Sequence, residues 1–132
     1  EGNKLVQKND GLKHIFNLLK YGVNLGNEDG AELLRNVTAG FLLNYLVDQK
    51  DLQEEALDKN LIDIACDVLD IDSKSQGNNS THVLLTLEVV NDSGFQFLDE
   101  RLINVLIAVL TDDRSSELSQ ICLELLHGQA EN

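Results

Sequence analysis

The stretch DGLKHIFNLL (Asp10–Leu19) returns in outline as NLIDIACDVL (Asn60–Leu69) and again as RLINVLIAVL (Arg101–Leu110). In each copy, the residues two, five, eight and nine positions after the first are apolar. One more apolar residue stands four positions before each copy: Val6, Ala56 and Phe97. This spacing keeps the apolar side chains on one face of an α-helix, so each copy predicts a helix with a buried face.

The copies begin 50 and 41 residues apart. Repeats of about 40–47 residues are typical of stacked helical arrays of the HEAT and armadillo kinds. The apolar pattern and the polar breaks predict three helices in each repeat, which favours armadillo over the two-helix HEAT unit. We expect short first helices at Asn3–Lys8, Leu52–Asp58 and Phe95–Glu100. Second helices are expected at Leu12–Tyr21, Leu61–Asp70 and Leu102–Leu110, and third helices at Ala31–Val47, Ser80–Val90 and Ser116–His127.

These ranges predict an all-α, armadillo-type right-handed superhelical solenoid. Its three three-helix repeats would span approximately 1–48, 49–91 and 92–132 within a single segment. The corners between first and second helices fall at Asp10-Gly11, Asn60 and Arg101. Gly and Asn suit a sharp corner because they tolerate a positive φ, whereas Arg101 fits the position less well.

The chain is acidic, with 23 Asp and Glu residues against 10 Lys and Arg residues and a net charge of −13. Nucleic-acid binding needs clustered basic residues, so a DNA or RNA partner is not expected. A basic protein partner is the natural complement of this charge. The acids are densest from Asp48 to Asp72, a span that also reads as a solvated outer face that keeps the array soluble.

The third helices line the concave groove in armadillo stacks, and polar residues recur on them at four-residue spacing. The candidate partner-binding residues are Glu32, Asn36, Asn44, Asp48, His82, Thr86, Gln120 and Glu124. One interpretation is a polar, mildly acidic groove that hydrogen-bonds a partner. The other is that these are ordinary polar side chains on the wet face of a helix.

The sequence offers little for catalysis or for binding a cofactor. His14, His82 and His127 have no Cys or carboxylate at metal-ligand spacing, so no metal site is expected. Cys66 and Cys122 fall inside apolar helical patterns and are expected to be buried in a reduced compartment. Asp63, Asp67 and Asp70 share one side of a helix, and without burial they are expected to be solvated. We therefore expect neither an enzyme nor a cofactor.

No apolar run is long enough for a membrane-spanning helix, and no secretory signal is present, so a cytoplasmic protein is expected. The chain begins at Glu1 and contains no Met, which indicates an internal piece of a longer array. Its two ends would then expose apolar faces and could self-associate. The residues expected on these faces are Leu5, Val6, Ile121, Leu125 and Leu126.

The stretch from Glu32 to Ile62 carries a further indication. Its segments Glu32–Leu34, Gly40–Tyr45, Asp51–Gln53 and Leu57–Ile62 resemble the armadillo repeats of the small-GTPase GDP dissociation stimulators, the SmgGDS family. The most specific element is Leu43-Asn44-Tyr45, and a weaker similarity runs over almost the whole chain. The groove Asn of armadillo receptors appears clearly once, at Asn44, and Gly40 stands where those receptors have Trp.

The resemblance implies a cytosolic protein–protein binding module that forms part of a guanine-nucleotide exchange factor and chaperone. The implied partner is a Rho- or Rap-type small GTPase with a basic, prenylated tail, and the implied action is stimulation of GDP release. An acidic array suits a basic tail. The alternative is an armadillo scaffold or adaptor for another protein partner, of the cytoskeletal or myosin-chaperone type.

Overall fold

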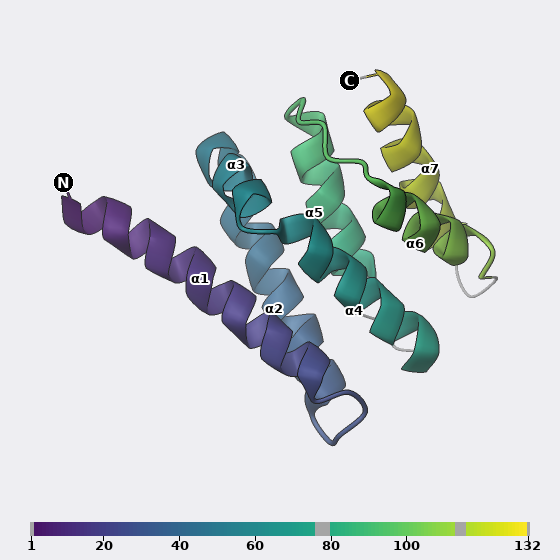
Figure 1. The fold of residues 1–132 in the computed structure, drawn as a ribbon, viewed down its shortest axis with the longest axis horizontal. Helices are drawn as coiled ribbons and strands as arrows, with labels where there is room; N and C mark the ends of the chain where they lie inside the picture. Colours follow the sequence, from purple (N-terminus) through teal and green to yellow (C-terminus); the bar gives the residue numbers. More distant parts are fainter. Residues whose placement is uncertain (1, 76–79, 113–115, 132) are drawn as a thin grey trace.

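The computed structural model describes residues 2–75, 80–112 and 116–131, which form α-helices and no strands, so the all-α prediction is confirmed (Figure 1). The helices are α1 (Gly2–Asn24), α2 (Ala31–Leu46), α3 (Lys50–Asp58), α4 (Leu61–Ser75), α5 (Ser80–Asp92), α6 (Glu100–Leu110) and α7 (Ser116–Glu131). None of the helices in the described ranges has the length and apolar character needed to cross a bilayer.

The helices pack in two layers (Figure 1). In one layer α1 packs on α4 and α4 on α6, and in the other α2 packs on α5 and α5 on α7. The contacts of α1 with α2, α4 with α5 and α6 with α7 join the layers, while α3 packs on α2 and α4. A continuous apolar core fills the space between the layers. Its fully buried members include Leu12, Leu69, Leu87 and Leu106.

Hydrophobic periodicity located the long helices well. The predicted third helices at Ala31–Val47 and Ser80–Val90 correspond to α2 and α5 with starts unchanged. The predicted second helix at Leu61–Asp70 is α4, which extends to Ser75. In these helices the apolar face is buried against neighbours, and this burial is what fixes the helix in place.

The predicted corner at Asp10-Gly11 is wrong. α1 runs through it without a break from Gly2 to Asn24, so the expected short helix Asn3–Lys8 is the start of α1. A glycine inside a helix costs only about 1 kcal/mol relative to alanine, and the long amphipathic pattern outweighs it. Gly11 instead allows α2 to lie close, because a Cβ there would stand 2.6 Å from the hydroxyl oxygen of Tyr45.

The predicted helix Phe95–Glu100 is also wrong. Residues 95–99 have no regular secondary structure, and Gln129 of α7 holds their backbone. The Gln129 Oε1 accepts hydrogen bonds from the Phe97 and Leu98 N–H groups at 2.7 and 3.1 Å, and its Nε2 donates to the Phe95 carbonyl at 2.9 Å. These bonds replace those that a helix would have made.

The α3–α4 corner at Asn60 is as predicted, with φ at 70°. Asn is among the few residues that adopt this left-handed conformation readily. Arg101 is no corner residue, because it lies in the first turn of α6, whose N-cap is Asp99. In the described part of the chain, the unit formed by α3, α4 and α5 is the one that has all three predicted helices.

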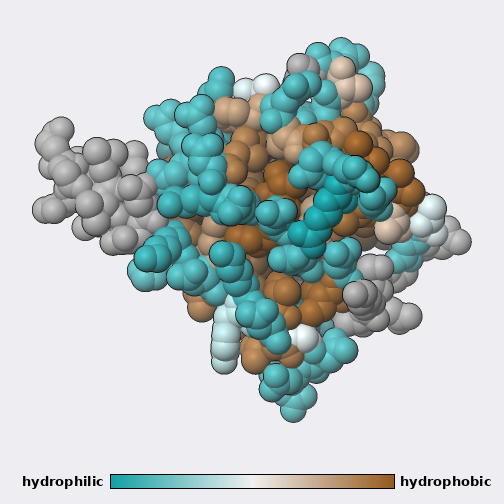
Figure 2. Space-filling model, viewed as in Figure 1, coloured by the Kyte–Doolittle hydropathy of each residue, from teal (hydrophilic) through white to brown (hydrophobic). Residues whose placement is uncertain are grey.

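The expected apolar end faces involve different side chains from those predicted. Ile121 and Leu125 are buried in the core and Leu126 is half-buried, while the side chains of Leu5 and Val6 lie outside the described residues. The exposed apolar residues on α2 are Leu33, Val37 and Phe41, and those on α6 and α7 are Ile103, Ile107 and Leu123. Figure 2 shows hydrophobic surface gathered over α6, at the right of the view.

Candidate partner-binding surface

The eight predicted groove residues lie on α2, α5 and α7 or next to them, and these helices form one layer. Glu32, Asn44, Asp48, Gln120 and Glu124 are exposed, and Asn36 and His82 are half-buried. Thr86 is the exception, because it is 1% exposed and its hydroxyl donates to the His82 carbonyl at 2.7 Å. The prediction that Thr86 faces a partner is therefore corrected: it lies in the core.

Glu88 of α5 and Glu124 of α7 are partners across the helix interface. Burial raises the pKa of the Glu88 carboxyl, and a side-chain hydrogen bond with Glu124 raises it further. The negative charges of Glu124 and Asp92 act in the same direction. Two carboxyl groups in hydrogen-bond contact favour sharing a proton over carrying two full charges.

Sequence reasoning missed Glu88. Four-residue spacing from His82 predicts Thr86 as the next residue on the outward face of α5. The half-buried residues of α5 include Leu85, Glu88 and Val89 instead. A signal was available, since Glu88 and Asp92 are the acids of this helix and lie four residues apart, on one face.

A cleft of about 410 Å³ opens where α2 and α5 end and α3 begins, and we call it the α2–α5 cleft. Its lining residues are Val47, Asp48, Lys50, Gln53, Val89, Asp92 and Ser93. Gln53 is 1% exposed, and its Nε2 donates to the Leu46 carbonyl at 2.9 Å. Its Oε1 is buried and has no hydrogen-bond partner among the described residues. An unsatisfied buried acceptor is uncommon and calls for a donor.

Charge in the α2–α5 cleft is mainly negative. Asp48 follows α2 with φ at 58°, and Asp92 is the last residue of α5, so both carboxylates lie near the negative ends of helix dipoles. Lys50 is the cation of the cleft, and its ammonium lies 5.7 Å from the centre of the Phe95 ring. Within the described residues, no ion pair joins Lys50 to either aspartate.

Four carboxyls thus follow one another across the layer, and we call them the acidic strip: Asp48, Asp92, Glu88 and Glu124. Asp48 and Asp92 share the cleft, Asp92 is one turn from Glu88, and Glu88 contacts Glu124. Two of the four, Asp48 and Glu124, were predicted from helical spacing. Across the described ranges, no Lys or Arg is paired with any of them.

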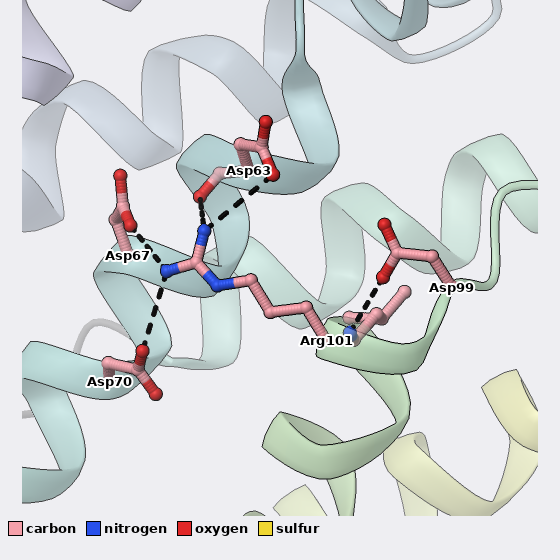
Figure 3. A network of polar contacts seen from close by, with 6 residues as sticks. Asp63, Asp67, Asp70, Asp99 and Arg101 are labelled. Carbon is pink, nitrogen blue, oxygen red and sulfur yellow. Dashed lines mark hydrogen bonds and ion pairs between the residues drawn. The ribbon is translucent and has the colours of Figure 1, made fainter.

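In the layer formed by α1, α4 and α6, three aspartates are paired with an arginine. Arg101 of α6 reaches across to α4 and lies among Asp63, Asp67 and Asp70 (Figure 3). Its Nη2 is 2.6 Å from Asp67 Oδ1 and 3.5 Å from Asp70 Oδ2, and its Nη1 is 3.6 Å from Asp63 Oδ1. The expectation that these aspartates are simply solvated is corrected, because they bind α6 to α4. Their side chains remain partly exposed, so each pair contributes modestly to stability.

Both cysteines are buried and form no disulfide, as predicted for small apolar residues. Burial raises the pKa of the Cys66 thiol to about 11, although the nearby Arg101 lowers it in part. Burial likewise raises the pKa of the Cys122 thiol to about 11. Both thiols are therefore protonated at neutral pH, which is the form that suits packing and not nucleophilic attack.

No protein family, curated protein or solved structure matches this chain. Among the residues that the structure describes, no three His, Cys, Asp or Glu side chains are arranged to hold a metal ion. The acidic strip and the α2–α5 cleft are therefore the features from which a function is inferred.

Proposed function

We propose that this chain is a protein–protein binding module that holds a basic segment of its partner. The observation that carries the proposal is the acidic strip, whose four carboxyls have no paired Lys or Arg among the described residues. The pKa of Glu88 is raised mainly by burial, with a further contribution from the negative charges of Glu124 and Asp92, which a positive charge brought to this surface would offset. A net charge of −13 adds long-range attraction for a basic partner.

The module is of the armadillo type in this proposal. The threefold apolar block, the two layers of helices and the three-helix unit α3–α5 support it. In such arrays each repeat packs on its neighbours, and the third helices together form a continuous binding surface. The acidic strip lies on α5 and α7 and at the end of α2, the helices that correspond to those third helices.

The proposed partner is a Rho- or Rap-type small GTPase with a basic, prenylated tail, and the chain would be part of its cytoplasmic exchange factor and chaperone. Two independent considerations support this partner: the resemblance of the Glu32–Ile62 stretch to the SmgGDS family, and the acidity of the surface. In this role the chain contributes binding energy for the tail and is not itself an enzyme.

The direct test is calorimetric titration of the chain with a prenylated Rho-type GTPase at low and high salt. We expect binding that weakens at least about tenfold between 50 and 300 mM salt, because screening removes attraction between exposed charges. A GTPase whose tail Lys and Arg residues are replaced by Gln should bind at least about tenfold more weakly. Release of a fluorescent GDP from the GTPase, measured in parallel, reports on exchange.

Two charge-matched variants locate the surface. E88Q/E124Q neutralises two acids of the strip, whereas E54Q/E117Q neutralises two exposed acids on α3 and α7 outside it. We expect the first variant to weaken binding about tenfold and the second by less than about twofold. Absence of salt-sensitive binding, or an equal loss in the two variants, contradicts the proposal.

One observation favours the alternative, an armadillo scaffold for another protein partner. Leu33, Val37 and Phe41 form an exposed apolar stripe along α2, at four-residue spacing. Such a stripe suits a general protein contact better than a basic tail. A chain that binds no small GTPase but loses a stable protein partner when Phe41 is changed to Glu supports this alternative.

A further inference from the structure

We propose that the α2–α5 cleft is a binding site for one arginine side chain of the basic partner. This rests on the proposed function and makes it more specific, because it names the chemical group and the place. The site combines a cleft of about 410 Å³, two aspartates without a paired cation among the described residues, and a buried amide oxygen without a donor. A volume of this order is that of a typical ligand pocket.

Gln53 gives the site its orientation. Its Nε2 donates to the Leu46 carbonyl, and a carbonyl oxygen can only accept, so the amide cannot be turned around. The Oε1 atom is therefore fixed as the atom that lacks a partner. Gln53 is 1% exposed and lines the cleft, so an occupant of that cleft is placed to supply the missing donor.

The acceptors favour guanidinium over ammonium. Asp48, Gln53 and Asp92 come from three different places in the chain, line the same cleft and carry oxygen acceptors. Guanidinium carries five N–H donors in a rigid planar fork, which satisfies several separate acceptors at once. Ammonium carries three donors on one small centre and is more strongly hydrated, so it gains less from the same site.

Lys50 also lines the cleft, but its ammonium is turned toward an aromatic ring. Its ammonium lies over the Phe95 ring, and the attraction of the ring for a cation keeps it there. Both aspartates are thereby left for an incoming cation. Lys50 nevertheless adds positive charge near the cleft, so removing it should strengthen the binding of an arginine.

The test uses three fluorescent hexapeptides, of Arg, of Lys and of citrulline, titrated into the chain at 150 mM salt. Arg and Lys peptides have the same charge, so the overall field of the protein treats them alike. We expect the Arg peptide to bind at least about fivefold more tightly than the Lys peptide, and the neutral citrulline peptide not to bind. The side-chain NH₂ signals of Gln53 in an NMR spectrum should shift with the Arg peptide alone.

Variants with matched charge test the place. D48N/D92N should weaken the Arg peptide at least about tenfold and remove its advantage over Lys. Asn keeps the fold at position 48, because it adopts a positive φ as readily as Asp. The control D29N/D58N changes two exposed acids away from the cleft and should alter binding by less than about twofold. K50Q should tighten the binding of the Arg peptide, while K59Q, at an exposed position outside the cleft, should not.

Each outcome decides between the two proposals. Equal binding of Arg and Lys peptides, or equal losses in D48N/D92N and D29N/D58N, overturns the arginine site and leaves a diffuse acidic surface for a basic partner. No binding of either cationic peptide overturns both proposals. An Arg preference that disappears in D48N/D92N, with a circular dichroism spectrum unchanged from the parent chain, supports the site.

Discussion

Gln129 is a single side chain that determines the path of a whole segment. It is 3% exposed, and its amide accepts from the backbone of Phe97 and Leu98 while donating to the Phe95 carbonyl and to Asn91 Oδ1. The segment 95–99 has no helix of its own, so its polar groups depend on this amide. The chain thus places a polar residue in its core to hold a loop.

Gln129→Ala should lower the free energy of unfolding by about 3 kcal/mol, because it leaves backbone N–H groups of residues 97 and 98 without acceptors. Urea unfolding followed by circular dichroism measures the change. Gln120→Ala, at an exposed position on the same helix, is the control and should change stability by less than about 0.5 kcal/mol. Equal effects of the two substitutions would show that the Gln129 contacts are dispensable.

Glu88 makes stability depend on pH in a direction that can be stated. Burial and its contact with Glu124 raise the pKa of Glu88 in the folded chain above its ordinary value. Between these two pKa values the folded state binds more protons than the unfolded state, so stability falls as pH rises through this range. The contribution of Glu88 to stability is therefore greatest below the ordinary pKa of a Glu carboxyl and is lost as the pH rises through the raised pKa of the folded chain.

Glu88→Gln should consequently stabilise the chain at pH 7 and have a smaller effect near pH 3, where Glu88 is protonated in both states. The measurement is the urea midpoint at both pH values. Glu54→Gln, on an exposed position of α3, is the charge-matched control and should not show this difference. A Glu88→Gln midpoint that exceeds the parent's equally at both pH values would disprove the assignment.

At the scale of helices, apolar periodicity predicted most of the helices, because each helix buries one apolar face in the core. The starts of α4 at Leu61 and of α5 at Ser80 follow from the apolar spacing and from the polar breaks that precede these helices. The breaks between helices were harder to predict. Asp10-Gly11 has the residues of a corner, yet α1 continues through it. Segment 95–99 looks helical, yet it is held by Gln129, more than 30 residues later. A partner so distant in sequence leaves no local signal.

The same limit applies to the site. Asp48 and Glu124 were found because regular helical spacing places them on the outer face. Gln53 and Asp92 were missed, since they reach the α2–α5 cleft only through the packing of α3 and α5 against α2 and α4. Asp92 lies off the four-residue stripe of α5, and the spacing argument applied to the third helices alone, which do not include α3. Helical spacing in the sequence identifies the exposed face of one helix, whereas the tertiary packing determines which residues of different helices line the same cleft.

Gly40 lies in the interior of α2 and does not need to be glycine. A Cβ there would be 3.6 Å from His82 Cε1, which is an ordinary contact. Gly40→Ala should therefore raise the free energy of unfolding by about 1 kcal/mol, through better helix propensity and a less flexible unfolded chain. Thermal unfolding measures it as a higher Tm.

Gly128→Ala is the contrasting substitution. A Cβ at position 128 would overlap the amide of Asn91, whose Oδ1 accepts a hydrogen bond from Gln129 at 2.8 Å. We expect Gly128→Ala to lower the Tm, although both substitutions replace a helical glycine. If both variants change the Tm in the same direction, close approach does not explain the glycine at position 128.

Over the whole molecule, the two layers differ in whether their acidic residues are paired with a basic residue. One layer balances part of its acid internally, where Arg101 joins α6 to Asp63, Asp67 and Asp70 of α4. The other layer keeps its acidic strip open. Apolar side chains are exposed mainly on α2 at one side of the stack and on α6 and α7 at the other. Self-association through these faces stays a prediction, with Phe41 and Ile107 in place of the buried Ile121 and Leu125.

The hold of Gln129 on residues 95–98 has a consequence for the order of folding. The bonds span 31 to 34 positions of the sequence, and the residue that supplies them lies in α7, which follows α6 in the chain. During synthesis α1 to α5 emerge with their own helical hydrogen bonds, whereas the connection to α6 has to wait for α7. This late closure leaves the amides of Phe97 and Leu98 open to solvent until α7 docks.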